Sequence, residues 1–208
     1  MSTDRPADEA WNRLARGNDR FLADAPQHPR QDAHRRSELA EGQRPVAAVL
    51  GCSDSRVAAE VLFDQGLGDL FVIRNAGQVA SASAIASVEY AVAVLGVPLV
   101  VVLAHDSCGA VQAAIDAAAP DAAPLPPLIA AHIQAIRPAV RAAADGGAPA
   151  VGEAHLQSTV ASLLGASDLL SAAVADGSVD VIGAQYRLAE GRVERRFAVG
   201  ATAGADAA

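Results

Sequence analysis

Two short stretches of the sequence carry side chains that can bind a metal ion. Cys52 and Asp54 follow one apolar run, and His105 and Cys108 follow another. Cys52 and Cys108 are the only two cysteines of the chain. Zinc favours thiolate sulfur and imidazole nitrogen, and tetrahedral zinc sites also use carboxylate oxygen. We therefore expect Zn2+ bound by Cys52, His105 and Cys108. Three protein ligands leave a fourth position for water or for Asp54, which is the pattern of catalytic zinc.

Asp54 and Arg56 stand two positions apart and can pair through a carboxylate–guanidinium fork. Such a pair can simply fix the loop. It can also serve catalysis, because an Asp54 held by Arg56 accepts a hydrogen bond from zinc-bound hydroxide, whereas a released Asp54 binds zinc and displaces the water. A further hypothesis is that Cys52 and Cys108 serve only as small buried apolar side chains. Burial alone, however, does not require Asp54, Arg56 and His105 beside them.

Three apolar runs must position these side chains. Residues 46–50, 70–73 and 99–103 have the composition of fully buried strands, and helical patterns separate them. Strands that alternate with helices predict a mainly parallel sheet with helices on both faces, an α/β fold. Reactive loops of such sheets gather at the carboxyl ends of the strands. If the three strands are neighbours, the metal-binding stretches converge in one place.

Patterns in the rest of the sequence predict an N-terminal helical arm, a hairpin and a C-terminal tail. Bulky residues recur at helical spacing over residues 11–22, and this helix can pack on its own core or on a second subunit. A single helix is expected over residues 128–144 and another over 151–164, and residues 179–199 read as a hairpin. We expect an N-terminal helical arm (1–45), a zinc-binding α/β catalytic domain (46–199) and a disordered tail (200–208).

Composition narrows the class of function. The chain has 208 residues and a formal charge of -8, which repels a phosphate backbone, so no nucleic-acid partner is expected. The longest apolar runs fall far short of the ~20 residues of a spanning helix, so no membrane role is expected. The first residues lack the apolar segment of a signal peptide. These features predict a cytoplasmic protein.

Four motifs, in this order, resemble the β-class carbonic anhydrases. They are Gly-Cys-Ser-Asp-Ser-Arg-Val at residues 51–57, Phe-Asp-Gln-Gly-Leu-Gly-Asp-Leu-Phe-Val-Ile-Arg-Asn-Ala-Gly at 63–77, Ser-Val-Glu-Tyr-Ala-Val at 87–92 and His-x-x-Cys-Gly-Ala-Val at 105–111. The resemblance runs over nearly the whole chain.

The resemblance implies a carbonate dehydratase that reversibly hydrates CO2 to bicarbonate and a proton by attack of zinc-bound hydroxide. It implies zinc bound by Cys52, His105 and Cys108, with Asp54 and Arg56 as the catalytic pair. It also implies about four parallel strands with an antiparallel edge strand, a dimer or tetramer with the active site near the subunit interface, and an N-terminal helix that reaches over the partner.

Two other functions fit the same residues. One is hydrolysis of carbonyl sulfide or carbon disulfide at the same site, and the other is a non-catalytic, zinc-stabilised oligomeric module in which Asp54 closes the metal site. The chain also departs from the family pattern, since Ala104 stands where Gly is usual and Gln78 where Asn is common. The methyl group of Ala104 could crowd the metal loop. Val49 replaces a Trp that accompanies an accessory bicarbonate site, so that form of inhibition is not expected.

Overall fold

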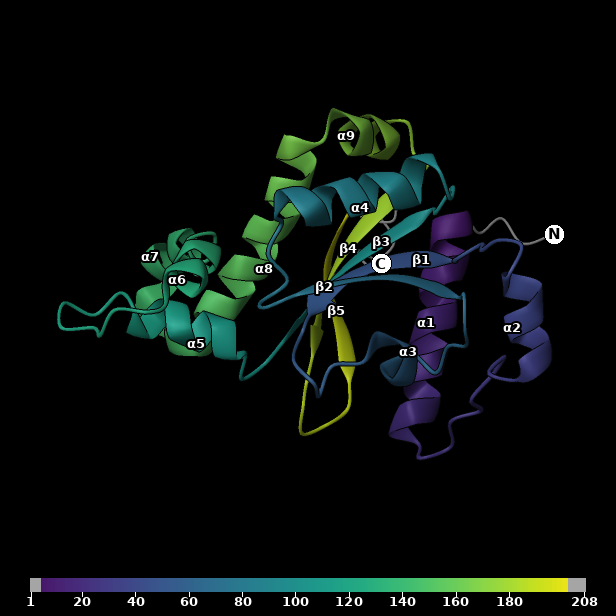
Figure 1. Cartoon of the computed structure of the whole chain (residues 1–208), viewed down its shortest axis with the longest axis horizontal. Helices are drawn as coiled ribbons and strands as arrows, with labels where there is room; N and C mark the ends of the chain where they lie inside the picture. Colours follow the sequence, from purple (N-terminus) through teal and green to yellow (C-terminus); the bar gives the residue numbers. More distant parts are fainter. Residues whose placement is uncertain (1–4, 202–208) are drawn as a thin grey trace.

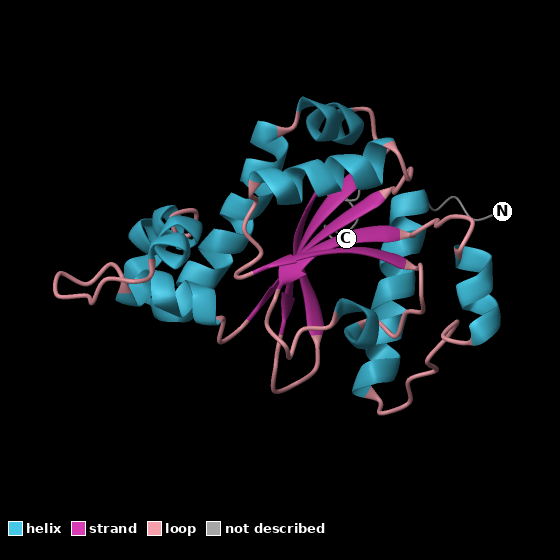
Figure 2. Cartoon of the chain, viewed as in Figure 1, coloured by secondary structure: helices cyan, strands magenta, loops and turns pink. Residues whose placement is uncertain are grey.

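A five-stranded sheet in the order β2-β1-β3-β4-β5 forms the centre of the computed structural model, which describes residues 5–201 (Figures 1 and 2). The first four strands run parallel, and the last runs antiparallel to β4 at one edge. The predicted α/β class is thereby confirmed. The strands are β1 Ala47–Cys52, β2 Leu70–Asn75, β3 Leu99–His105, β4 Asp180–Tyr186 and β5 Val193–Val199.

The central strands are apolar because both of their faces are covered. Every residue of β1, β3 and β4 is buried, as expected of parallel strands between two layers of helices. In β3, Val101 and Leu103 enter one core cluster and Val102 and Ala104 enter the other. Gly51 and Cys52 prolong β1 beyond the predicted run, so Cys52, the first predicted metal ligand, is part of the strand itself.

Helices from different parts of the chain cover the two faces. On one face lie α1 Pro6–Leu22 and α3 Ala59–Leu62, and on the other lie α4 Ala82–Ala93, α8 Gly147–Ala166 and α9 Asp168–Ala175 (Figure 1). The short α2 Ala33–Leu39 buries no residue. Beside the sheet stand α5 Gly109–Asp116, α6 Pro127–Ile133, α7 Arg137–Ala143 and the 3-10 turn η1 Ala144–Gly146.

The single helix predicted over residues 128–144 is wrong. The structure has α6 and α7 instead, separated at residues 134–136. Pro138 explains the break, because its ring would clash with the carbonyl of residue 134 and it has no N–H to donate. The helix predicted over 151–164 is longer at both ends and begins at Gly147.

The N-terminal helix α1 buries its apolar face against the chain's own core. Leu14 is fully buried there, and Trp11 and Phe21 pack at the margin. The Asn18 amide donates to Leu62 O (3.1 Å) and to Gly191 O (2.9 Å). Of the two packing partners that the sequence allowed, the structure shows the chain's own core. Contact of the remaining surface of α1 with a second subunit stays a prediction.

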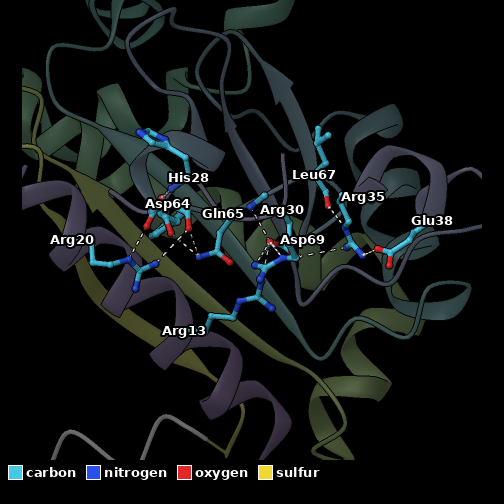
Figure 3. A network of polar contacts seen from close by, with 12 residues as sticks. Arg13, Arg20, His28, Arg30, Arg35, Glu38, Asp64, Gln65, Leu67 and Asp69 are labelled. Carbon is cyan, nitrogen blue, oxygen red and sulfur yellow. Dashed lines mark hydrogen bonds and ion pairs between the residues drawn. The ribbon is translucent and has the colours of Figure 1, made fainter. Parts of the chain in front are cut away.

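Two buried carboxylates also hold the N-terminal segment (Figure 3). Asp64 accepts from Arg20 Nε at 2.6 Å and from the backbone N–H groups of residues 27 and 28, each at 2.9 Å. Asp69 pairs with Arg13 at 2.8 Å and with Arg30, whose Nε lies 3.1 Å from Asp69 Oδ1. The Asp64 and Asp69 side chains are 1% and 5% exposed. We call these contacts the arm network.

Two further expectations concern the ends and the surface. Of the predicted tail, residues 202–208 lie outside the described part of the chain, while Ala201 N donates to Asp180 Oδ1 at 3.0 Å. Within residues 5–201 no single helix is both long and apolar enough to cross a membrane, although α8 and α9, bent by 99°, pass that test together.

Candidate metal centre

The structure brings Cys52, His105 and Cys108 together. Cys52 ends β1, His105 ends β3 and Cys108 caps α5. Because β1 and β3 are parallel neighbours, both strands deliver their last side chains to the same edge of the sheet. The Sγ atoms and an imidazole nitrogen of these three residues lie within 4.8 Å of one another, and all three residues are buried. The group has the size and composition of a site for one metal ion.

The turn between β3 and α5 sets the direction of the second pair of ligands. Ser107 adopts a left-handed conformation with φ of 51°, which brings the chain round within a few residues. The Asp106 N–H donates to Tyr186 O at 3.2 Å, and Asp106 Oδ1 accepts from the Leu188 N–H at 3.1 Å. The metal loop is thus tied to the end of β4.

His105 presents one free nitrogen to the site. Its Nδ1 lies 2.7 Å from the carbonyl oxygen of Asp106. A carbonyl only accepts, so Nδ1 carries the proton and Nε2 holds a lone pair. That Nε2 is buried and has no hydrogen-bond partner among the described residues. A buried acceptor without a donor costs free energy. One bound cation would supply the missing partner of Nε2 and would bind the two neighbouring sulfurs as well.

The two thiols differ in their surroundings. Hydrogen bonding with Cys108 lowers the pKa of Cys52, and the N–H groups of Gly77 (3.2 Å) and Asp54 (3.4 Å) act in the same direction. The same contact with Cys52, together with burial, raises the pKa of Cys108. A cation that binds thiolates would favour the deprotonated form of both thiols, and Zn2+ fits this donor set of two sulfurs and one imidazole.

Asp54 lies beside these three residues but is held by Arg56. Its Oδ1 accepts from Arg56 Nε at 2.9 Å and its Oδ2 from Nη2 at 2.6 Å, while Oδ2 lies 4.0 Å from His105 Nε2. The Arg56 hydrogen bonds hold the pKa of Asp54 well below its usual range. The carboxylate is therefore ionised, and both of its oxygens face the guanidinium.

Sequence reasoning missed several supporting contacts. Arg74 donates from Nε to Cys52 O (3.0 Å) and from Nη2 to Asp54 O (2.7 Å), so it fixes the backbone of the first metal-binding stretch. Its place at the end of β2 was visible in the sequence, but its partners were not. The contact of the Gly77 N–H with Cys52 Sγ comes from a backbone group, so no side chain in the sequence indicated it.

The departure at Ala104 does not crowd the metal loop. Ala104 is buried in the core cluster covered by α4 and α8, on the face of β3 opposite Leu103 and His105. Its methyl group therefore contributes to the core. Val49 is likewise fully buried in the sheet.

Comparisons with known proteins agree with the motifs. The family model described as carbonic anhydrase matches residues 47–193. Carbonic anhydrase 2 of Mycobacterium tuberculosis is 46% identical over 194 residues, which are 92% of this chain and 93% of that protein. The carbonic anhydrase of Mycolicibacterium smegmatis is also 46% identical, over 92% of this chain and 94% of its own.

Solved structures agree with the fold. The Coccomyxa β-carbonic anhydrase, determined in complex with acetazolamide, has a TM-score of 0.68 at 27% identity and covers 94% of this chain and 87% of its own. A tetrameric β-carbonic anhydrase of Sordaria macrospora has a TM-score of 0.69 at 21% identity, with 90% and 97% covered, which shows the shared fold. This chain belongs to the β-carbonic anhydrase family, whose members are carbonate dehydratases.

Proposed function

We propose that this protein is a zinc enzyme that reversibly hydrates CO2 to bicarbonate and a proton. Cys52, His105 and Cys108 are the proposed zinc ligands. One observation carries this proposal: an imidazole nitrogen of His105 and the two thiol sulfurs lie within 4.8 Å of one another, and the buried Nε2 of His105 has no hydrogen-bond partner in the part of the chain that the structure describes. Membership of the family supports the same reaction.

Zinc held by such a set lowers the pKa of water from 15.7 towards neutrality, to about 7 in the best-known site with three His ligands. Two thiolates place more negative charge on the metal than neutral imidazoles do. We therefore expect a less acidic water in this protein and activity that increases towards alkaline pH.

Asp54 is the proposed acceptor for the proton of the attacking oxygen. Its depressed pKa keeps it ionised, and an ionised carboxylate can only accept hydrogen bonds. Its Oδ2 lies 4.0 Å from His105 Nε2, beside the proposed ligands, where it would accept that proton and leave a lone pair of the oxygen free to attack the carbon of CO2. Addition of that oxygen to CO2 would form the new C–O bond of bicarbonate. Water would then replace the bicarbonate, and the proton that this water loses would pass to buffer.

Arg56 is the proposed restraint on Asp54. It donates to both carboxylate oxygens and also to Ser107 O at 3.3 Å. The guanidinium thereby bridges the two metal-binding stretches and keeps Asp54 from becoming a fourth ligand. This pairing favours an active site over a closed, non-catalytic zinc module.

We further propose that the chain self-associates as a dimer or tetramer and functions in the cytoplasm. Large apolar side chains that the single chain leaves exposed on α3, on the loop after it, on α4 and at the end of α4 support self-association, because a subunit interface would remove them from water. These side chains are Val61, Leu67, Tyr90 and Val94. The division into an arm (1–45) and a catalytic domain (46–199) is part of the same proposal.

Stopped-flow CO2 hydration combined with metal analysis tests the function. We expect about one zinc per chain, as in other three-ligand sites, and hydration that increases with pH. Stoichiometric zinc without hydration at alkaline pH would contradict the proposal and favour the closed module. Turnover of carbonyl sulfide or carbon disulfide with little turnover of CO2 would instead identify the hydrolase.

A further inference from the structure

A backbone amide supports the Cys52 sulfur from the side of β2. The Gly77 N–H donates to Cys52 Sγ at 3.2 Å, in a buried contact. This amide belongs to the turn between β2 and α4, in which the Asn75 side chain bonds Val79 twice, at 2.8 and 2.7 Å. The turn is therefore closed at its base, and its tip points at the sulfur.

The tip of this turn has little freedom. Gly77 has φ of 79°, a conformation that residues with a Cβ rarely adopt, and a Cβ there would lie 2.9 Å from Ala110 Cβ and 3.2 Å from Ile136 Cδ1. The turn thus fits against α5 and against the segment between α6 and α7. Small changes in its position would move the amide relative to Cys52.

Two histidines from other helices hold the outer side of the same turn. His132 Nε2, on α6, lies 2.8 Å from Ala76 O, and His155 Nε2, on α8, lies 2.7 Å from Gly77 O. Carbonyl oxygens only accept, so each Nε2 carries the proton. Figure 1 shows α8 running beside the segment that leads from β2 to α4.

The two hydrogen bonds act on different peptide units. The carbonyl of Ala76 and the N–H of Gly77 belong to one peptide, so the contact from His132 polarises the same unit that donates to Cys52 Sγ. Hydrogen bonds in such a chain strengthen one another. The contact from His155 falls on the next peptide and fixes the direction of the turn.

His155 donates its hydrogen bond to Gly77 O from a buried, otherwise apolar position. It is 1% exposed, and its Nδ1 has no partner within residues 5–201. Burial lowers the pKa of His155, so the ring is neutral and its one N–H goes to Gly77 O. A buried polar side chain that makes a single side-chain hydrogen bond, directed at this turn, does not serve packing alone.

We propose that His155 and His132 are positioning residues for the metal thiolate of Cys52, because they hold the Ala76 and Gly77 carbonyls so that the Gly77 N–H stays on Cys52 Sγ. This inference rests on the zinc site proposed above. An N–H donor on a ligating sulfur withdraws charge from it and fixes its orientation, as partners of metal ligands generally do. The histidines thereby tune the site without touching metal or substrate.

Cobalt-substituted protein provides the test, since sulfur-to-cobalt charge-transfer absorption reports the charge on the thiolates. In His132→Leu and His155→Leu we expect this band to move to longer wavelength, and zinc, measured by chelator competition, to bind about 10- to 100-fold more weakly. His132→Gln and His155→Gln keep an amide N–H near the position of Nε2 and should restore most of both properties. His132 is only partly buried, so its variants test the inference even if His155→Leu fails to fold.

Val160→Ala is the matched control. Val160 lies on α8 and is 2% exposed, but it packs in the core cluster under α4 and α9. It should lower thermal stability and leave the band in place. Leu variants with wild-type band and affinity would overturn the inference, as would an equal shift in Val160→Ala. Wild-type protein that takes up no Co2+ would overturn the zinc site itself, and the inference with it.

Discussion

Asp54 at the metal centre and Asp69 in the arm network are both paired with arginine, but the pairs are built differently. Asp54 is held by Arg56, two positions along the chain, and the Arg56 side chain is 53% exposed. Asp69 is 5% exposed and is held by Arg13 and Arg30, which come from the N-terminal segment. The first pair lies within one loop. The second joins distant parts of the chain, and its carboxylate is buried while its two arginines are 31% and 42% exposed (Figure 3).

Because of this difference, we expect the two pairs to respond differently to substitution. Removing one partner of a buried ion pair leaves an uncompensated charge and costs much of the protein's stability. Breaking a pair whose arginine is in water leaves the guanidinium solvated. We infer that the arm network fixes the fold, whereas the Asp54–Arg56 pair controls what lies next to the metal.

The largest effect is expected from removal of the metal. Chelation, or Cys52→Ser, should reduce CO2 hydration to the uncatalysed background, because the proposed source of the nucleophile is lost. The arm network should persist. Fluorescence of Trp11, the one Trp of the chain, which packs at the margin of the core on α1, checks this. Full activity in chelated, metal-free protein would contradict the proposed chemistry.

Substitution of Asp54 should affect the reaction more than the fold. In Asp54→Ala we expect hydration to fall about 10²- to 10⁴-fold, the usual contribution of a positioned proton acceptor, with zinc retained. Asp121→Ala, at an exposed position, is the control and should leave both unchanged. Loss of zinc along with activity would show Asp54 to be a ligand in place of a proton acceptor.

Substitution of Asp69 should give the reverse result. Asp69→Ala removes the shared carboxylate of Arg13 and Arg30 and the acceptor of the Gly66 N–H. We expect the free energy of unfolding to fall by about 1–3 kcal/mol, the cost of a buried hydrogen-bonding group left without its partner. Urea unfolding measures this loss, and hydration per folded molecule should change little. Unfolding at the wild-type urea concentration would show that the arm network does not fix the fold.

Acid should lower the stability of the protein through Asp64 in the arm network. Burial by itself raises the pKa of Asp64, but hydrogen bonds from the Gln27 N–H, Arg20 and the His28 N–H outweigh it, and the net shift is downward. The stabilisation is therefore present above the unfolded carboxyl pKa of about 3.9 and is lost as pH falls through the lower folded value. Unfolding measured against pH should show less acid dependence in Asp64→Asn. An unchanged profile would exclude Asp64 from this role.

The grouping of Cys52, His105 and Cys108 was predictable because side chains with distinctive chemistry stood at the ends of apolar runs. Cys52 and His105 meet because β1 and β3 are parallel neighbours. The alternation of strands and helices predicted the parallel direction, whereas the neighbouring position was only a condition of the prediction. The fold class followed from the same pattern.

What the sequence did not show depends on backbone atoms and on packing. The Gly77 N–H on Cys52 Sγ comes from a main-chain group that every residue except proline carries. The histidine contacts to Ala76 O and Gly77 O depend on where α6 and α8 lie, and no local pattern gives that. The break before α7 was visible at Pro138, but the apolar pattern around it concealed the signal.

Zinc-edge anomalous diffraction from crystals grown at alkaline pH tests the central claim most directly. The metal peak should lie between Cys52 Sγ, His105 Nε2 and Cys108 Sγ, with a fourth ligand that is not protein and with Asp54 still paired to Arg56. A metal peak elsewhere, or Asp54 bound to the metal in every subunit, would contradict it.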